Sequence, residues 1–265
     1  MRFVLITLTT VLFAVSAKSQ SELAFGDGER LEFAVSYRAK MWPNTDVGDL
    51  VLSVSKQHDL FTIVGHGQSR PFFRWFFDLN DTYTTLMDAS TLKPLSASER
   101  TRHGKYQFDG NKEFDWSEMV VRSTWRTLRH PENRHKTISI TEQSVDALSL
   151  FYRLRNTDTA TLKIGVPVPL EMVLKDTIRI VNYTFLGRDV LNVSGLGRFR
   201  AFKFSCTLAT SSSESFEDGS EFFIWISDDL NRIPLLVESP IRVGSVRARL
   251  RRFDGLRHPM DSRIR

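Results

Sequence analysis

The chain has 265 residues, of which 41% are hydrophobic and 25% charged, and its formal net charge is +5. This is an ordinary globular balance, long enough for one sizeable core or two small ones. The only cysteine is Cys206, which excludes an internal disulfide and leaves the fold to rest on its core. No cysteine stands where a lipoprotein anchor would be attached.

Residues 1–17 have the pattern of a cleavable secretory signal. Met1 and Arg2 give a short positive start, and residues 3–15 are apolar apart from three threonines. Val15 and Ala17 then provide small residues before a cleavage site, with cleavage after Gln20 as an alternative. The apolar run is shorter than the roughly 20 residues that span a bilayer, which disfavours an uncleaved anchor, and no later segment is suited to span a membrane. We therefore expect an exported protein, periplasmic or extracellular.

Period-two alternation of apolar and polar residues dominates after the signal and predicts strands. Before residue 140 the predicted strands are 31–37, 50–54, 60–64, 83–87, 105–108, 113–116 and 120–125. Asp109-Gly110-Asn111 is a hairpin signal between two of them. Further strands are expected at 178–180, 183–185, 201–208, 221–226, 233–237 and 245–250.

Two stretches favour helix instead. Pro71 suits a helix start, so residues 71–77 predict a short aromatic helix. In residues 142–155, Val145, Leu148, Phe151 and Leu154 recur at helical spacing. Ser144 is the expected N-cap of this helix, and its apolar stripe should pack across the sheet.

The remaining segments are expected to be turns, loops and one tail. Gly195-Leu196-Gly197 and Asp228-Asp229 are expected turns, and residues 211–219 an exposed loop. Residues 22–253 should form a single β-rich domain, followed by a mobile basic tail at 254–265. The arginines that crowd residues 247–265 favour contact with anionic lipid or glycan, or mere solubility, over nucleic acid in an exported protein.

A search for chemical motifs yields no catalytic residue, no metal site and no cofactor. His130 and His135 lack the spacing of a zinc motif, and no nucleophile elbow is present. Cys206 lies in an alternating segment and is expected to be a buried strand residue.

Aromatic residues are the unusual feature. Five rings fall within the seven residues of 71–77, and one core face cannot take all of them. We expect some to stay open, with Arg70 and Arg74 at their edge. The alternative is that they plug one end of the protein's own core. The predicted ligand contacts are Trp42, Phe72, Phe73, Trp75 and Phe76.

Six short motifs in a fixed order resemble a bacterial exported family, domain of unknown function 3108. They are FGDGERL at 25–31, DASTLKP at 88–94, DALSLFYRLR at 146–155, GLGRF at 195–199, IWISDD at 224–229 with RIP at 232–234, and GSVRARL at 244–250. The resemblance covers residues 25–253 and implies a curved antiparallel sheet with a crossing helix, a shape that by analogy is similar to periplasmic carriers of lipids and lipoproteins. It implies no functional residues, because no activity is assigned to the family.

The sequence thus predicts a mainly β fold, with a single strongly curved antiparallel sheet, open or nearly closed as a barrel, and one packed α-helix. The expected function is non-enzymatic binding or chaperoning of an apolar or amphipathic ligand at the cell envelope. An envelope interaction protein with a filled core is the alternative, and an enzyme acting on envelope polymers is disfavoured because no paired carboxylates stand out. Expected partners are a lipid-like ligand or an envelope protein, not nucleic acid.

Overall fold

The structure, a computed structural model, describes residues 22–39, 42–75, 77–208, 221–240 and 245–265. The predicted signal at 1–17, the predicted loop at 211–219 and Phe76 lie outside the described residues. The backbone of Trp42 is described, whereas its side chain lies outside this part of the structure.

The described chain forms one sheet of sixteen strands. In spatial order the path is β8-β7-β6-β5-β4-β3-β2-β1-β15-β14-β13-β12-β11-β10-β9, and β16 pairs with β12 beside this path. Neighbours are antiparallel except for β9 and β10. The bounds are β1 Arg30–Ala39, β2 Trp42–Gln57, β3 Leu60–Ser69, β4 Asn80–Asp88, β5 Pro94–His103, β6 Tyr106–Asp115, β7 Val120–Thr127, β8 Arg134–Ser139, β9 Ser144–Val145, β10 Pro167–Val173, β11 Ile178–Val193, β12 Gly197–Leu208, β13 Glu221–Ser227, β14 Pro234–Pro240, β15 Ser245–Asp254 and β16 Arg263–Ile264.

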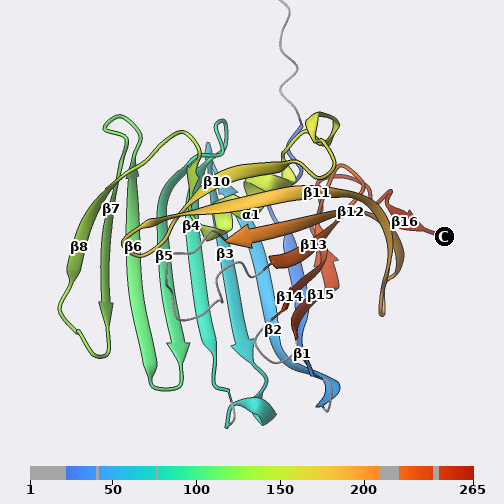
Figure 1. Cartoon of the computed structure of the whole chain (residues 1–265), viewed down its shortest axis with the longest axis horizontal. Helices are drawn as coiled ribbons and strands as arrows, with labels where there is room; N and C mark the ends of the chain where they lie inside the picture. The colour runs from blue at the N-terminus through green and yellow to red at the C-terminus, as the bar shows by residue number, and fades with distance from the viewer. Residues whose placement is uncertain (1–21, 40–41, 76, 209–220, 241–244) are drawn as a thin grey trace, which may run out of the picture.

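The sheet curls back over itself, and helix α1 (Ala147–Arg155) lies between its two halves. In Figure 1, β10, β11 and β12 cross in front of β3–β6, with α1 behind them. Val173 and Ile178, at the β10–β11 hairpin, pack with residues of the opposite half that include Phe114 and Val121. The predicted class, one strongly curved antiparallel sheet with one packed helix, is confirmed.

Helix α1 packs against both halves of the sheet because its apolar side chains point in two directions. Leu148 and Tyr152 belong to the main core cluster with strands β1–β3 and β12–β15. Leu150 and Leu154 pack against a second cluster that β10–β13 provide.

The helix begins later than the sequence suggests, and its N-cap is Asp146 rather than Ser144. The Asp146 carboxylate accepts hydrogen bonds from the Leu148 and Ser149 amides at 2.9 and 3.3 Å. It also accepts one from the Thr85 hydroxyl on β4, at 2.6 Å. Ser144 instead lies in β9, where its hydroxyl donates to Glu171 at 2.6 Å. The prediction failed because a charged cap that also bonds the sheet satisfies the helix amides better than a serine two residues earlier.

The predicted hairpin at 109–111 is wrong, because these residues lie in the middle of the continuous strand β6. The turn falls at Gly104 and Lys105, where Gly104 has a φ of 55° that favours glycine. Glycine at position 110 makes room for a neighbouring side chain, since a Cβ there would lie 2.7 Å from the Phe108 ring. Strand β5, which precedes the turn, was not predicted because its sequence is largely polar.

The C-terminal segment also differs from its prediction as a mobile tail. It folds back onto the sheet, where β16 pairs with β12. The Asn231 side chain donates to the His258 and Pro259 carbonyls at 2.9 and 3.0 Å, and Ser262 donates to Asp229 at 2.6 Å. Composition alone did not reveal this because the partners of the segment come from a distant turn.

Candidate functional site

The structure places the predicted aromatic contacts on the aromatic turn, the connection 70–79 between β3 and β4. In the described part of this turn, residues 71–73 form a 3-10 helix and the rest is not helical. Phe72 and Trp75 are 75% and 80% exposed, whereas Phe73 is half-buried. Trp42 opens β2 at the same end of the sheet, since it pairs with Ala39 across the β1–β2 turn. This exposure agrees with the expectation that one core face could not take all the rings.

An apolar groove of about 390 Å³ lies on the concave side of β1–β4. Helix α1 completes its walls with Leu148 and Phe151, together with residues of β14 and β15. Its volume falls within the roughly 300–1,000 Å³ typical of small-molecule sites. Its apolar lining includes Phe33, Leu50, Phe77, Leu79, Leu148 and Phe151. Of the four described rings in 71–77, Phe77 belongs to the lining, whereas the predicted contacts Phe72, Phe73 and Trp75 lie outside the groove.

Two glycines on β3 line the groove. Residues 61 to 69 of this strand alternate, and Phe61 and Ile63 fill the interior where Gly65 and Gly67 follow on the same face. A Cβ on Gly65 would come within 3.2 Å of Leu148 and Leu52. A Cβ on Gly67 would meet only Leu79 at 3.7 Å and Leu50 at 4.0 Å, so Gly67 borders open space. The groove therefore stays open at Gly67, whereas the space beside Gly65 is taken by Leu148 and Leu52.

Asp81 and Tyr83 of β4 line the groove beside its apolar walls, and each contacts a residue of β5. The Tyr83 hydroxyl donates to Glu99 at 3.3 Å, and burial together with the Glu99 charge raises the pKa of Tyr83. Asp81, nearer the aromatic turn, lies 2.8 Å from His103 Nε2. A ligand in the groove would thus meet apolar walls over most of its length and polar groups on one side.

The opposite side of α1 is filled. The space between α1 and β11–β13 is about 20 Å³, enough for about one water molecule. Cys206 lies in its wall, is buried as predicted, and burial raises the pKa of its thiol to about 12. A protonated thiol is a poor nucleophile. The interior is therefore filled on one side of the helix and hollow on the other.

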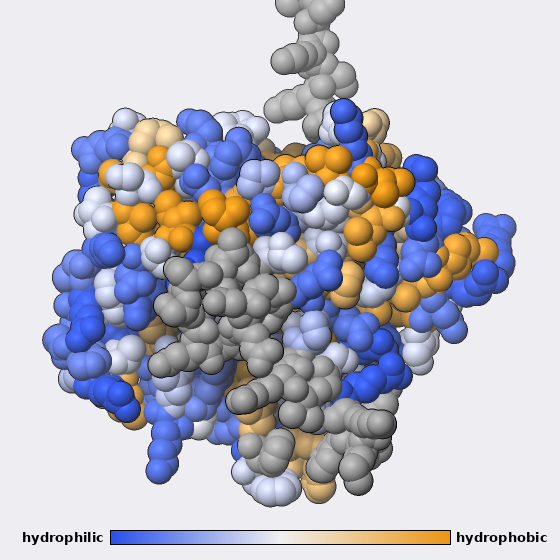
Figure 2. All heavy atoms as spheres, viewed as in Figure 1, coloured by the Kyte–Doolittle hydropathy of each residue, from blue (hydrophilic) through white to orange (hydrophobic). Residues whose placement is uncertain are grey.

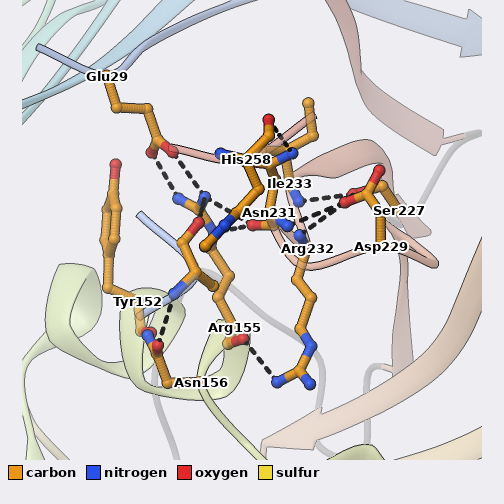
Figure 3. A network of polar contacts seen from close by, with 11 residues as sticks. Glu29, Tyr152, Arg155, Asn156, Ser227, Asp229, Asn231, Arg232, Ile233 and His258 are labelled. Carbon is orange, nitrogen blue, oxygen red and sulfur yellow. Dashed lines mark hydrogen bonds and ion pairs between the residues drawn. The ribbon is translucent and has the colours of Figure 1, made fainter. Parts of the chain in front are cut away.

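The most deeply buried charges form a polar network at the end of α1, which sequence reasoning missed (Figure 3). Arg155 and Glu29 are 1% and 0% exposed in their side chains and form a bidentate pair at 2.6 and 2.7 Å. Arg155 also donates to the carbonyls of Ala24 and Asn231 at 3.0 and 2.8 Å. Burial alone would lower the pKa of Arg155, but the Glu29 carboxylate outweighs it and the pKa is raised.

A loop connects this network to the C-terminal segment. Asp229 accepts from the amide of Asn231 at 3.0 Å, which closes the turn that Asp228-Asp229 predicted. The Arg232 guanidinium donates to the Arg155 carbonyl at 3.1 Å. Tyr152 lies beside the pair, and its buried hydroxyl makes no hydrogen bond of ordinary geometry within the described residues. Because Arg155 and Glu29 satisfy each other, we interpret the network as structural. The available signal was that Glu29, Arg155 and Asp229 all fall in the motifs quoted for the family resemblance.

The arginines of β15 are held in ion pairs. Arg247, Arg249 and Arg251 alternate with the apolar residues of the strand and point to the outer face. Arg247 pairs with Glu238 at 2.8 Å, and Arg251 lies 3.5 Å from Asp49. This part of the positive charge is therefore largely neutralised within the protein.

Two general searches of the described residues give negative results. Within those residues, no group of three or more histidine, cysteine, aspartate or glutamate side chains is placed to hold a metal ion. Across the same ranges, no helix has the length and apolar character needed to cross a bilayer.

Comparison with known proteins gives a family and a structural neighbour. A search of curated proteins finds no match. A crystal structure of a beta-barrel-like protein of the domain of unknown function DUF1849 from Brucella abortus is similar in fold, with a TM-score of 0.59 and 10% sequence identity. The match covers 88% of this chain and 99% of that one. A family model matches residues 32–251, and the chain therefore belongs to the family described as protein of unknown function (DUF3108).

Proposed function

We propose that this chain is an exported, non-enzymatic protein that binds an apolar or amphipathic ligand in the groove beneath α1. The observation that carries the proposal is the groove of about 390 Å³ among apolar walls, which an inward glycine, Gly67, leaves open. Open apolar space inside a protein costs stability. A ligand that fills the groove would recover that stability and would explain why β3 carries glycine at position 67, where the chain itself leaves space.

The polar lining supports an amphipathic ligand. Tyr83, Asp81 and Gln68 border the groove, whereas Leu148 and Phe151 close it beneath α1. An acyl chain along the apolar walls, with its polar group beside β4, would satisfy both parts. A plain hydrocarbon would leave the polar groups facing apolar surface.

We expect Gly67→Leu to weaken binding of the apolar dye N-phenyl-1-naphthylamine by about tenfold or more, because a leucine side chain would occupy ligand space. A Cβ at this position meets no atom closer than 3.7 Å, so the variant should fold. Val64→Leu is the matched control, since residue 64 alternates with Gly65 and points away from the groove. Dye fluorescence titration measures both affinities.

The same titration separates this proposal from the alternative of an interaction protein with a filled core. A wild-type chain that binds no dye and yields no small molecule in mass spectrometry of organic extracts would favour the filled core. Equal loss of binding in Gly67→Leu and Val64→Leu would move the ligand site away from the groove.

Export is part of the proposal and rests on residues 1–17. N-terminal sequencing of the protein from the cell envelope should find a mature chain that starts at Lys18 or Ser21, after cleavage behind Ala17 or Gln20. An intact Met1 in a soluble cytoplasmic fraction would contradict export.

A further inference from the structure

We propose that the chain docks onto an anionic lipid bilayer through one end of its sheet, with the aromatic turn inserted at the interface. This end, called here the aromatic end, consists of the aromatic turn, the β5–β6 turn and the β7–β8 loop. All three connections lie at the lower edge of the sheet in Figure 1. The docking surface is separate from the walls of the groove, apart from Phe77.

Exposed large apolar side chains gather at the aromatic end. Phe72, Trp75 and Phe77 are 75%, 80% and 51% exposed, and Tyr106 and Leu128 are 52% and 61% exposed. Direct contacts connect the three connections. The rings of Phe77 and Tyr106 lie 6.0 and 6.2 Å from that of His103, and the Leu128 amide donates to Gln107 at 3.1 Å. The five side chains therefore form one surface.

The opposite end of the same strands has a different character. The turns β2–β3, β4–β5 and β6–β7 carry the acidic residues Asp59, Asp88, Asp115 and Glu118. In the described part of these turns no large hydrophobic side chain is exposed. The two ends are formed by successive turns of the same strands. The contrast between apolar and acidic residues therefore reflects where these residues are placed and not the overall composition.

The charges at the aromatic end favour an anionic partner. Arg74, Lys105 and Arg129 are exposed, and no carboxylate lies within ion-pair distance of them in the described residues. The exposed acids there are Asp78 and Glu132, and Glu132 lies near His130 and Arg134. Tryptophan, tyrosine and phenylalanine next to arginine and lysine are the residues that settle at the interface of a bilayer. Anionic headgroups would add electrostatic attraction.

A second apolar surface does not share these properties. Figure 2 shows apolar side chains gathered in a band over β10 and β11, where Val166 and Val190 are each 49% exposed. This band consists mainly of aliphatic side chains on the face of a hairpin, and nothing in the structure shows what covers it. It carries no proposal.

The aromatic end also adjoins the groove. Phe77 is 51% exposed and belongs to the groove lining, together with its neighbour Leu79. If the chain binds an amphipathic ligand as proposed above, docking at this end would place the groove beside the membrane that supplies or receives the ligand. The exchange of ligand with the membrane rests on the proposed function, whereas docking itself does not.

Vesicle sedimentation tests the docking. The vesicles contain phosphatidylethanolamine and phosphatidylglycerol, mixed in equal amounts. We expect the wild-type chain to bind them, and the double variant Phe72→Ser/Trp75→Ser to bind them about tenfold or more weakly. The matched control is Ile164→Ser/Leu230→Ser, which removes side chains that are 69% and 57% exposed away from this end. Arg74→Glu/Lys105→Glu should also weaken binding, and added salt should reduce wild-type binding.

A spectroscopic readout locates the contact. Brominated lipid should quench tryptophan fluorescence of the wild-type chain, and Trp75→Phe should lose most of that quenching while still binding vesicles. No vesicle binding by the wild type, equal loss in the control pair, or capture of an envelope protein through the same rings without vesicle binding would each overturn the proposal. Gly67→Leu should bind vesicles normally, so failure of the groove and failure of docking are distinguishable.

Discussion

Replacing Arg155 with methionine should lower the free energy of unfolding by about 3–5 kcal/mol. The change leaves the Glu29 carboxylate, fully buried, without its partner. It also removes the donor that the carbonyls of Ala24 and Asn231 share. A buried charge without a partner is among the most costly defects in a folded protein. Urea denaturation followed by circular dichroism measures the change.

Two further variants isolate the cause. Arg122→Met removes an arginine from solvent-exposed pairs with Asp115 and Glu118 and should cost far less stability than Arg155→Met. Glu29→Leu/Arg155→Met should be more stable than Arg155→Met alone, because no charge is left buried. It should remain below the wild type because the two carbonyls still lack a donor. A cost for Arg155→Met equal to that of Arg122→Met would contradict the network as described.

The network matters for the groove because it fixes the position of α1. Arg155 is the last residue of the helix, and its partners lie before β1, in the β13–β14 turn and, through Asn231, in the C-terminal segment. At the other end of the helix, Asp146 bonds Thr85 of β4. Both ends of the helix are thus tied to the sheet by polar contacts. The wall that Leu148 and Phe151 give to the groove is held in place without filling the groove.

Local patterns predicted most strands because alternation follows directly from burial of one sheet face. These local patterns fail where contacts with residues distant in the sequence decide the structure. Asp109-Gly110-Asn111 has the composition of a turn, yet it lies in a strand because β5 and β7 pair with it on both sides. The polar strand β5 escaped prediction because strands on either side supply its pairing.

The groove was not predictable from the sequence for a related reason. The alternating apolar pattern predicts β3 only to residue 64, because Gly65, a residue unfavourable in strands, interrupts it. The strand in fact continues to Ser69, and the two glycines that interrupt its pattern line the groove. The aromatic content instead predicts ligand contacts at Phe72 and Trp75, which lie at the aromatic end. Composition showed that these rings could not share one core, but not where the hollow lies.

Leu148→Ala should lower the free energy of unfolding by about 2–5 kcal/mol, toward the lower end of that range. Leu148 is 9% exposed, belongs to the main core cluster and fits against Gly65, whose missing side chain makes room for it. Part of its surface already faces the groove, so fewer packing contacts are lost than at a fully enclosed site. Denaturant titration measures the change, with Leu148→Met as a volume-conserving control that should cost less than about 1.5 kcal/mol.

The location of Leu148 also gives the variant a second, independent readout. Truncation should enlarge the groove beneath α1, so Leu148→Ala should change dye affinity, whereas Leu230→Ala, at a side chain that is 57% exposed, should change neither affinity nor stability by more than about 0.5 kcal/mol. A stability loss below about 1 kcal/mol for Leu148→Ala would mean that this face of the helix is solvated. In that case Leu148 would not pack against β3, and α1 would not form a wall of the groove.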